Sequence, residues 1–192
     1  MLESLRVLEF QFTWRSYQEK LLKNFDAHIA DHHFHVIAPP GSGKTILGIE
    51  ILRRLGKKTL VLAPTLTIRN QWQDRLQTFF TDNERFKLCS LDIKQPSEIT
   101  FSTYQSLHSF YKSFEDKDDF LGFFKDHNIE TIVLDEAHHL KSTWSFEKES
   151  FANTVFEVTA PSILDYVGEY RMEEEVLSYK LKMPNKWIVG AA

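Results

Sequence analysis

The sequence predicts an α/β fold, with a mostly parallel β-sheet and helices on both of its faces. The first observation is that short apolar runs alternate along the chain with segments of helical periodicity, a pattern typical of parallel sheets. The second is that runs such as residues 59–63 and 131–135 are apolar almost throughout, as in strands buried on both faces. The third is size, because 192 residues, 42% of them hydrophobic, are enough to bury a core without disulfides or metals.

The expected elements follow from these patterns. Helical periodicity marks residues 14–30, 45–55, 67–80 and, more weakly, 117–127. Short apolar runs are the expected strands, at residues 34–38, 59–63, 86–90, 99–103, 131–135 and 155–159. Gly56 is expected to cap the C-terminus of the second helix. Because ligands of such sheets bind at the carboxyl ends of the strands, functional residues are expected directly after strands.

Composition limits the possible classes of protein. The formal net charge is −4, so any site for a polyanion would have to be a local basic patch. Residues 53–87 form such a patch, with eight basic and three acidic side chains. The chain has a single cysteine, Cys89, which excludes an internal disulfide and favours a reducing compartment. No secretion signal or apolar run of about 18 residues is visible, so we expect a cytoplasmic protein with no membrane partner.

A phosphate-binding loop is predicted at residues 38–45, which read APPGSGKT. The glycines allow the backbone to wrap a phosphate chain, and the helix that follows points its positive end at the phosphates. Lys44 would contact the outer phosphates, and the Thr45 hydroxyl would bind Mg²⁺. The alternative is an ordinary glycine and proline turn before a helix. The expected nucleotide-binding residues of the loop are Pro40, Gly41, Ser42, Gly43, Lys44 and Thr45.

A pair of carboxylates follows the apolar run at residues 131–135. Asp135, at the strand end, would hold Mg²⁺, and Glu136 would orient or deprotonate the attacking water. The alternative is an acidic helix start after a buried strand. If both sites are real, Lys44 and Asp135 converge across neighbouring strand ends with a triphosphate and its magnesium between them.

The loop APPGSGKT followed by DEAH at residues 135–138 resembles the first RecA-like domain of a superfamily 2 helicase. Within that superfamily it is similar to the DEAD/DEAH-box and restriction-enzyme helicase-subunit group, over about residues 10–162. Segments similar to the family's other motifs occur in order, at residues 14–18, 62–72, 101–107 and 158–162. The last reads Thr159-Ala160-Pro161, without the hydroxyl residue usual before the proline, and Leu66 stands where many relatives carry arginine.

The resemblance implies roles for further residues. Gln18 would read the adenine, and Thr65, Arg69 and Thr103 would hold the backbone of a nucleic acid. The residues that would couple ATP turnover to movement are His138, Thr159 and Ala160. The nucleic acid would be DNA rather than RNA, by analogy with the restriction subunits.

The resemblance also implies how the chain is organised. Residues 1–165 would form the RecA-like ATP-binding lobe, and residues 166–192 stay unassigned. Such motors bind ATP and Mg²⁺ between two lobes. No second phosphate-loop unit fits after Ser162, so we expect a second RecA-like domain in cis or in trans and slow ATP hydrolysis without it.

Two other function classes remain open at this stage. One is a nucleotide-binding interaction module, or inactive fragment, without motor activity of its own. The other is a phosphoryl-transferring phosphate-loop enzyme such as a small-molecule kinase, against which the strand before Asp135 and the segments around Thr65 and Thr103 argue.

Overall fold

The computed structural model describes residue 5 and residues 8–29, 33–36, 41–80, 88–136 and 187–191. The helices are α2 (Ser16–Ala27), α3 (Lys44–Leu55), α4 (Leu66–Phe80), α5 (Tyr104–Tyr111) and α6 (Lys117–Asp126). The strands are β1 (His33–Val36), β2 (Thr59–Ala63), β3 (Cys89–Ser90), β4 (Ile99–Thr103), β5 (Thr131–Asp135) and β6 (Trp187–Ala191). They form one six-stranded sheet in the order β1-β6-β5-β2-β4-β3.

Every strand pair in this sheet is parallel. The carboxyl ends of the strands therefore lie along one edge, where the phosphate loop and the carboxylates are expected. The predicted α/β fold with a parallel sheet is confirmed.

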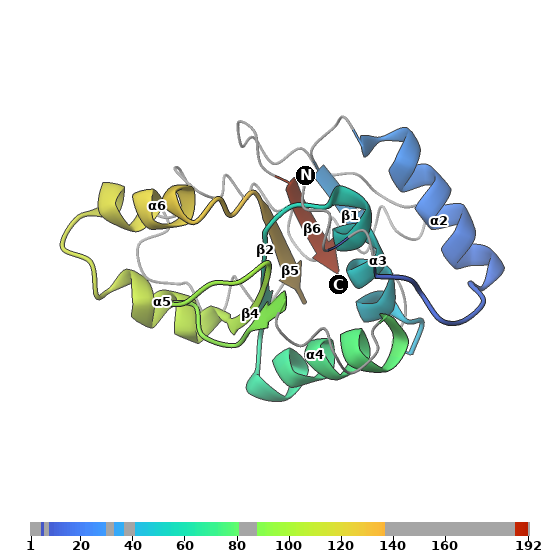
Figure 1. Ribbon diagram of the computed structural model, residues 1–192, viewed down its shortest axis with the longest axis horizontal. Helices are drawn as coiled ribbons and strands as arrows, with labels where there is room; N and C mark the ends of the chain where they lie inside the picture. The colour runs from blue at the N-terminus through green and yellow to red at the C-terminus, as the bar shows by residue number, and fades with distance from the viewer. Residues whose placement is uncertain are drawn as a thin grey trace, which may run out of the picture.

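Helices cover both faces of the sheet, as Figure 1 shows with α5 and α6 on one side and α2 and α3 on the other. The side chains of the central strands alternate between these two layers. In β2, Leu60 and Leu62 pack with α5 and α6, whereas Val61 packs with α2, α3 and α4. In β5, Leu134 likewise packs on the side of α5 and α6, and Val133 packs on the side of α2, α3 and α4. The two hydrophobic clusters thus fix the sheet between two helical layers.

The layer that contains the phosphate-loop helix is tied together by a buried carboxylate. Glu50 of α3 is 2% exposed and accepts hydrogen bonds from Arg53 and Arg54 at 2.7–2.8 Å. Arg54 also pairs with Asp26 and donates to the carbonyl of Leu22, both in α2. This network holds α2, which carries Gln18, against α3, which begins at Lys44.

Most of the predicted elements lie where the periodicity placed them, with ends moved by at most three residues. Gly56 caps α3 in the left-handed conformation, with φ 58°, as predicted. Helix α5 was not predicted, because its eight residues give too few turns for a clear periodicity. The predicted strand at residues 155–159 lies outside the described residues.

Strand β6 changes the expected topology. It lies between β1 and β5, and its residues belong to the segment 166–192 that received no role from the sequence. The strand ends that lead to Lys44 and Asp135 are therefore not neighbours, contrary to the expectation. A short apolar run without helical or alternating periodicity does not reveal which strands it pairs with.

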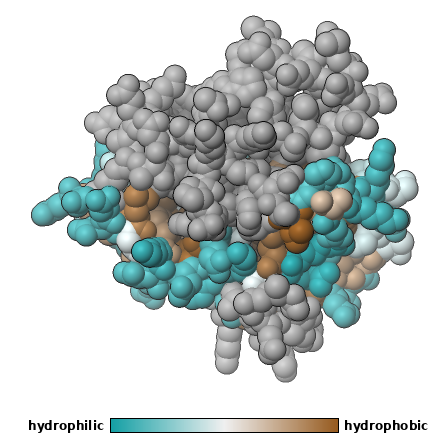
Figure 2. Space-filling view, turned by 90° about the horizontal axis from the view of Figure 1, so that it is seen from above, coloured by the Kyte–Doolittle hydropathy of each residue, from teal (hydrophilic) through white to brown (hydrophobic). Residues whose placement is uncertain are grey.

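In the view of Figure 2 the described surface is mainly hydrophilic, with smaller hydrophobic areas. Among the described residues, no helix is both long enough and apolar enough to cross a bilayer.

Candidate nucleotide site at the carboxyl edge of the sheet

The predicted phosphate loop has the backbone of a loop that only glycine fits easily. Gly41 and Gly43 have φ of 77° and 85°, in the left-handed region that side chains disfavour. A Cβ atom on Gly43 would also lie 2.8 Å from Nε2 of Gln18. Gly43 is the N-cap residue of α3, so the helix begins directly at Lys44. The backbone N–H groups of this first turn have no partners within the helix, which is the arrangement that binds anions.

Helix α2 contacts the phosphate loop at Ser42. Both Tyr17, through its hydroxyl, and Gln18, through Nε2 at 3.3 Å, donate to the carbonyl oxygen of Ser42. Oε1 of Gln18 accepts the backbone N–H of Arg15 at 3.0 Å. Gln18 thus contacts the loop, and both the oxygen and the nitrogen of its side-chain amide make contacts within the protein. The hydroxyl of Ser42 is buried and has no hydrogen-bond partner within the described part of the chain.

The lysine and the carboxylates meet at the carboxyl edge, although β6 separates their strands. Nζ of Lys44 lies 3.5 Å from Oε1 of Glu136. The two side chains are 15% and 28% exposed, so the pair is open to solvent on one side. Thr45 follows in the first turn of α3 and is half-buried. The sequence analysis expected Lys44 and Asp135 to meet across neighbouring strand ends; the structure places Lys44 beside Glu136, the residue after Asp135, with β6 between the two strands.

Asp135 is a buried carboxylate, at 6% exposed. Its Oδ2 accepts the indole N–H of Trp72 at 2.7 Å, and its backbone carbonyl accepts the hydroxyl of Tyr104 at 2.8 Å. Burial raises the pKa of Asp135 above its usual value, and Glu136 adds to this, whereas the Trp72 hydrogen bond and Lys44 act in the opposite direction. A nearby divalent cation would favour the charged carboxylate.

Glu136 has an unusual backbone for a residue with a side chain. Its φ is 52°, in the left-handed region, which for such a residue costs of order 1–3 kcal/mol. Such conformations concentrate at functional sites. Here the turn directs the Glu136 carboxylate toward Lys44.

The predicted nucleic-acid residues occupy matching positions that differ in exposure. Thr65 follows β2, is exposed, and accepts the backbone N–H of Ile68 at 3.2 Å. Thr103 ends β4, is 4% exposed, and accepts the backbone N–H of Ser106 as the N-cap of α5. Arg69, in the first turns of α4, donates to the side chain of Asn70. Thr65 and Arg69 are therefore accessible from solvent, whereas the Thr103 hydroxyl is part of the helix cap.

The basic patch at residues 53–87 is partly neutralised by contacts within the protein. Arg53 and Arg54 bind Glu50, and Lys57 binds Glu130 at 2.8 Å. Arg75 lies over the ring of Phe79. The patch is therefore less free to bind a polyanion than its formal charge indicates.

Several predicted residues fall outside the described part of the chain, namely Pro40, His138, Thr159 and Ala160. Conversely, the sequence analysis missed three residues that contact the site, which are Tyr17, Trp72 and Tyr104. Trp72 offered a partial signal, because a tryptophan at a core position of a helix must place its N–H on some acceptor. The sequence did not indicate which acceptor.

The residues present fit a nucleoside triphosphate with Mg²⁺. A glycine loop at a helix N-terminus, the Lys44 amine and the buried Ser42 hydroxyl are suited to phosphate oxygens. The Thr45 hydroxyl and the Asp135 carboxylate supply the hard oxygen atoms that Mg²⁺ prefers, and this ion usually keeps several waters.

Comparisons with known proteins place this geometry in a family. The family described as "Type III restriction enzyme, res subunit" matches residues 11–163. A putative DNA 3'-5' helicase Rad25 of Halobacterium salinarum is 30% identical over 128 residues, which are 66% of this chain and 19% of the relative. A putative ATP-dependent RNA helicase QP509L of African swine fever virus is 27% identical over 148 residues, 76% of this chain and 28% of the relative. The chain therefore spans less than a third of either relative.

Two solved structures share the fold. The helicase domain of Hef from Pyrococcus furiosus has a TM-score of 0.50 at 18% identity, covering 93% of this chain and 32% of that one. The ATP-dependent Type ISP restriction-modification enzyme LlaBIII, bound to DNA, has the same TM-score and identity and covers 93% of this chain and 13% of that one. The family match over residues 11–163 and the parallel sheet lead to the same conclusion. The chain belongs to the family of Type III restriction enzyme res subunits, with the fold of a RecA-like helicase domain.

Proposed function

We propose that this chain is the ATP-hydrolysing, amino-terminal RecA-like lobe of a helicase or translocase that acts on nucleic acid, with residues 1–165 and strand β6 of the same sheet as the lobe. The observation that carries the proposal is the approach of Lys44 to Glu136, 3.5 Å apart, beside the buried Asp135. Two distant parts of the chain, Lys44 and the adjacent pair Asp135 and Glu136, thus meet at the edge where ligands of parallel sheets bind.

The phosphates are bound by the loop and by Lys44. The N–H groups of residues 41–45 point to the phosphate oxygens, Ser42 adds its buried hydroxyl, and Lys44 neutralises negative charge. Thr45 and Asp135 hold Mg²⁺, which when bound neutralises charge that develops on the transferred phosphoryl group. Gln18 holds the loop and reads the adenine edge.

Glu136 acts on the attacking water. One carboxylate oxygen accepts a proton from the water as it attacks, and the φ of 52° fixes the direction of the side chain. In the structure Lys44 contacts this carboxylate. A phosphate chain in the loop would provide Lys44 with a second anionic partner and leave a lone pair of Glu136 for water.

Nucleic acid would be held at the ends of β2 and β4. Thr65 and Arg69 contact backbone phosphates directly, while Thr103 caps α5 and so orients the first-turn N–H groups of that helix. We propose DNA as the polymer, because LlaBIII is bound to DNA and the Rad25 relative is named a DNA helicase. Coupling between the two sites is assigned to His138, Thr159 and Ala160.

The proposal includes a second RecA-like lobe, in cis or in trans. The two relatives are several times longer than the segment they share with this chain. A second lobe would supply the arginine that stabilises the transition state, which is worth about 10³–10⁵ in rate in related phosphoryl-transfer enzymes. The chain alone should therefore bind ATP and hydrolyse it slowly.

Single-turnover ATP hydrolysis tests this function, with and without duplex DNA or RNA, for the wild type and Glu136→Gln. We expect slow hydrolysis by the wild type, stimulated by DNA, and a rate lower by roughly 10²–10⁴ in the variant. ATP binding without hydrolysis under any condition would instead indicate an interaction module. Transfer of the phosphoryl group to an acceptor other than water would indicate a kinase.

A further inference from the structure

Asp135 is held by two aromatic side chains that the proposed function does not use. The indole N–H of Trp72 donates to its carboxylate at 2.7 Å, and the hydroxyl of Tyr104 donates to its backbone carbonyl at 2.8 Å. Both aromatic residues are at most 1% exposed. One contact fixes the direction of the carboxylate, and the other fixes the peptide unit that leads into Glu136.

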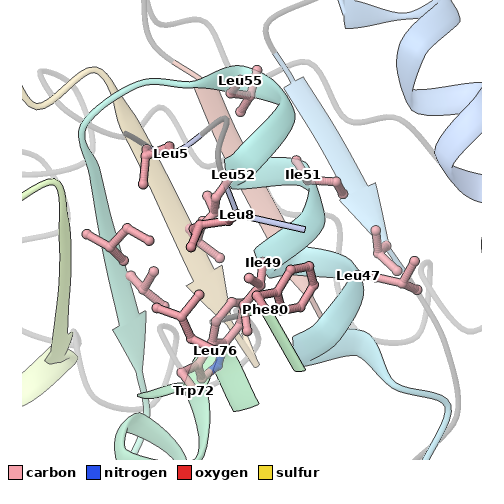
Figure 3. Packing of buried hydrophobic residues seen from close by; sticks show 14 of the residues in the cluster. Leu5, Leu8, Leu47, Ile49, Ile51, Leu52, Leu55, Trp72, Leu76 and Phe80 are labelled. Atoms are coloured by element: carbon pink, nitrogen blue, oxygen red, sulfur yellow. The ribbon is translucent and has the colours of Figure 1, made fainter. Parts of the chain in front are cut away.

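Trp72 belongs to α4, the helix that begins with the predicted nucleic-acid segment. In Figure 3 it lies with Leu76 and Phe80 on the face of α4 that packs toward α3. It also lies against the phosphate-loop helix, because a Cβ atom on Gly48 of α3 would be 2.4 Å from the indole ring. Trp72 therefore touches α3 and Asp135 at once, and any shift of α4 acts on both.

Tyr104 makes a comparable contact with Asp135 from the second predicted nucleic-acid segment. It is the first residue of α5, directly after the capping residue Thr103. Each of the two segments thus sends one aromatic donor to Asp135, although Trp72 and Tyr104 are 63 and 31 residues away from it in the sequence. Ordinary core packing explains the burial of these rings but does not require that both donate to the same residue.

We propose that Trp72 and Tyr104 are positioning residues that connect nucleic-acid contacts on α4 and α5 to the Asp135 carboxylate, so that nucleic acid adjusts the affinity for Mg²⁺. The proposal rests on the proposed function, because it assigns Mg²⁺ to Asp135. Partners that orient a metal ligand typically change metal affinity or activity by about 10–100-fold when they are removed. Here the hydrogen bonds from Trp72 in α4 and Tyr104 in α5 orient Asp135.

The test measures binding of a fluorescent, non-hydrolysable ATP analogue to the full chain as Mg²⁺ is titrated. The first variant is Trp72→Phe, which removes the N–H and keeps an aromatic ring. A second replaces Trp72 with benzothienylalanine, in which sulfur takes the place of the indole N–H and the shape is kept. The control is Leu76→Ala, one turn along α4 and also buried, at 2% exposed, because its side chain packs on the same face of the helix and carries no hydrogen-bonding group.

We expect both Trp72 variants to need roughly 10-fold more Mg²⁺ for half-maximal binding, with the control close to wild type. Unchanged Mg²⁺ dependence in the benzothienylalanine protein would overturn the proposal, and this protein decides the matter if Trp72→Phe does not fold. For Tyr104→Phe we expect a smaller shift, since a backbone carbonyl rather than the carboxylate loses its donor.

Added duplex DNA separates coupling from simple support. We expect DNA to lower the Mg²⁺ concentration for half-maximal binding in the wild type and to have little effect in the Trp72 variants. An equal DNA effect in wild type and variants would contradict the connection. If instead the wild type binds the analogue without any need for Mg²⁺ or Lys44, the proposed function fails, and with it the assignment of Mg²⁺ to Asp135.

Discussion

The two halves of the candidate site are built in different ways. The phosphate loop depends on local backbone, with two left-handed glycines immediately before a helix. The Asp135 half depends on residues distant in sequence: Trp72 and Tyr104, together with Lys44, which is 92 residues from Glu136. A local motif can be recognised in the sequence. In a site assembled by tertiary contacts, only the charged residues that follow the strand, here Asp135 and Glu136, can be recognised there. We therefore expect the phosphate loop to be sensitive to substitutions that change the backbone. The surroundings of Asp135 should be sensitive to substitutions that change side-chain packing.

Substitution of the loop glycines should give the largest effect on nucleotide affinity. Gly43→Ala combines a left-handed φ with a contact of 2.8 Å to Gln18, whereas Gly41→Ala has the same type of φ with nothing within 4 Å. Since such a backbone costs of order 1–3 kcal/mol, we expect affinity for the ATP analogue to fall by about 100-fold in Gly43→Ala and about 10-fold in Gly41→Ala. Titration of both variants measures this. Equal losses would show that the Gln18 contact has no influence.

Overpacking at Gly48 should damage the long-range half. A methyl group there would meet the Trp72 ring at 2.4 Å, so we expect Gly48→Ala to lower the free energy of unfolding by about 1–3 kcal/mol and to displace the indole from Asp135. Urea unfolding measures the loss. Gly122→Ala in α6 is the matched control, because nothing lies within 4 Å of its Cβ and helix propensity predicts a gain of up to about 1 kcal/mol. A loss of the same size in the control would contradict this explanation.

Removal of the Asp135 charge should stabilise the protein without nucleotide. Burial raises the pKa of Asp135, so the folded state binds its proton more tightly than the unfolded state. This contribution is present below the unfolded pKa of about 3.8 and is lost as pH rises through the folded pKa. We therefore expect Asp135→Asn to be more stable than wild type at pH 7, with the difference shrinking as pH is lowered. Thermal unfolding at several pH values measures this difference in stability. An Asp135→Asn variant that is less stable than wild type at pH 7 would contradict the raised pKa of Asp135.

The two threonines at strand ends should give the smallest effects, and of different kinds. Thr103→Ala removes a buried N-cap and should cost about 1 kcal/mol of stability. Thr65→Ala should cost less stability because Thr65 is exposed, but it should weaken DNA binding a few-fold at low salt. Unfolding and DNA titrations on both variants compare them. A larger loss of DNA binding in Thr103→Ala than in Thr65→Ala would reverse this comparison.

The same division explains what could be predicted from the sequence. The strand at residues 131–135 and the start of the phosphate loop depend on local apolar runs and on glycine chemistry, and both are visible in the printed sequence. The place of β6 between β1 and β5 depends on pairing between distant segments, which no local pattern encodes. The donors to Asp135 are likewise a product of the folded packing, because an indole N–H identifies a need for an acceptor but not its identity.

The most direct test of the central claim is a crystal structure of the chain with a non-hydrolysable ATP analogue and Mn²⁺ in place of Mg²⁺. The anomalous signal of manganese locates the metal without reference to any expected position. The account predicts a metal between the Thr45 hydroxyl and the Asp135 carboxylate, with the phosphates against the backbone of residues 41–45. A nucleotide bound away from that loop, or a metal distant from Asp135, would contradict it.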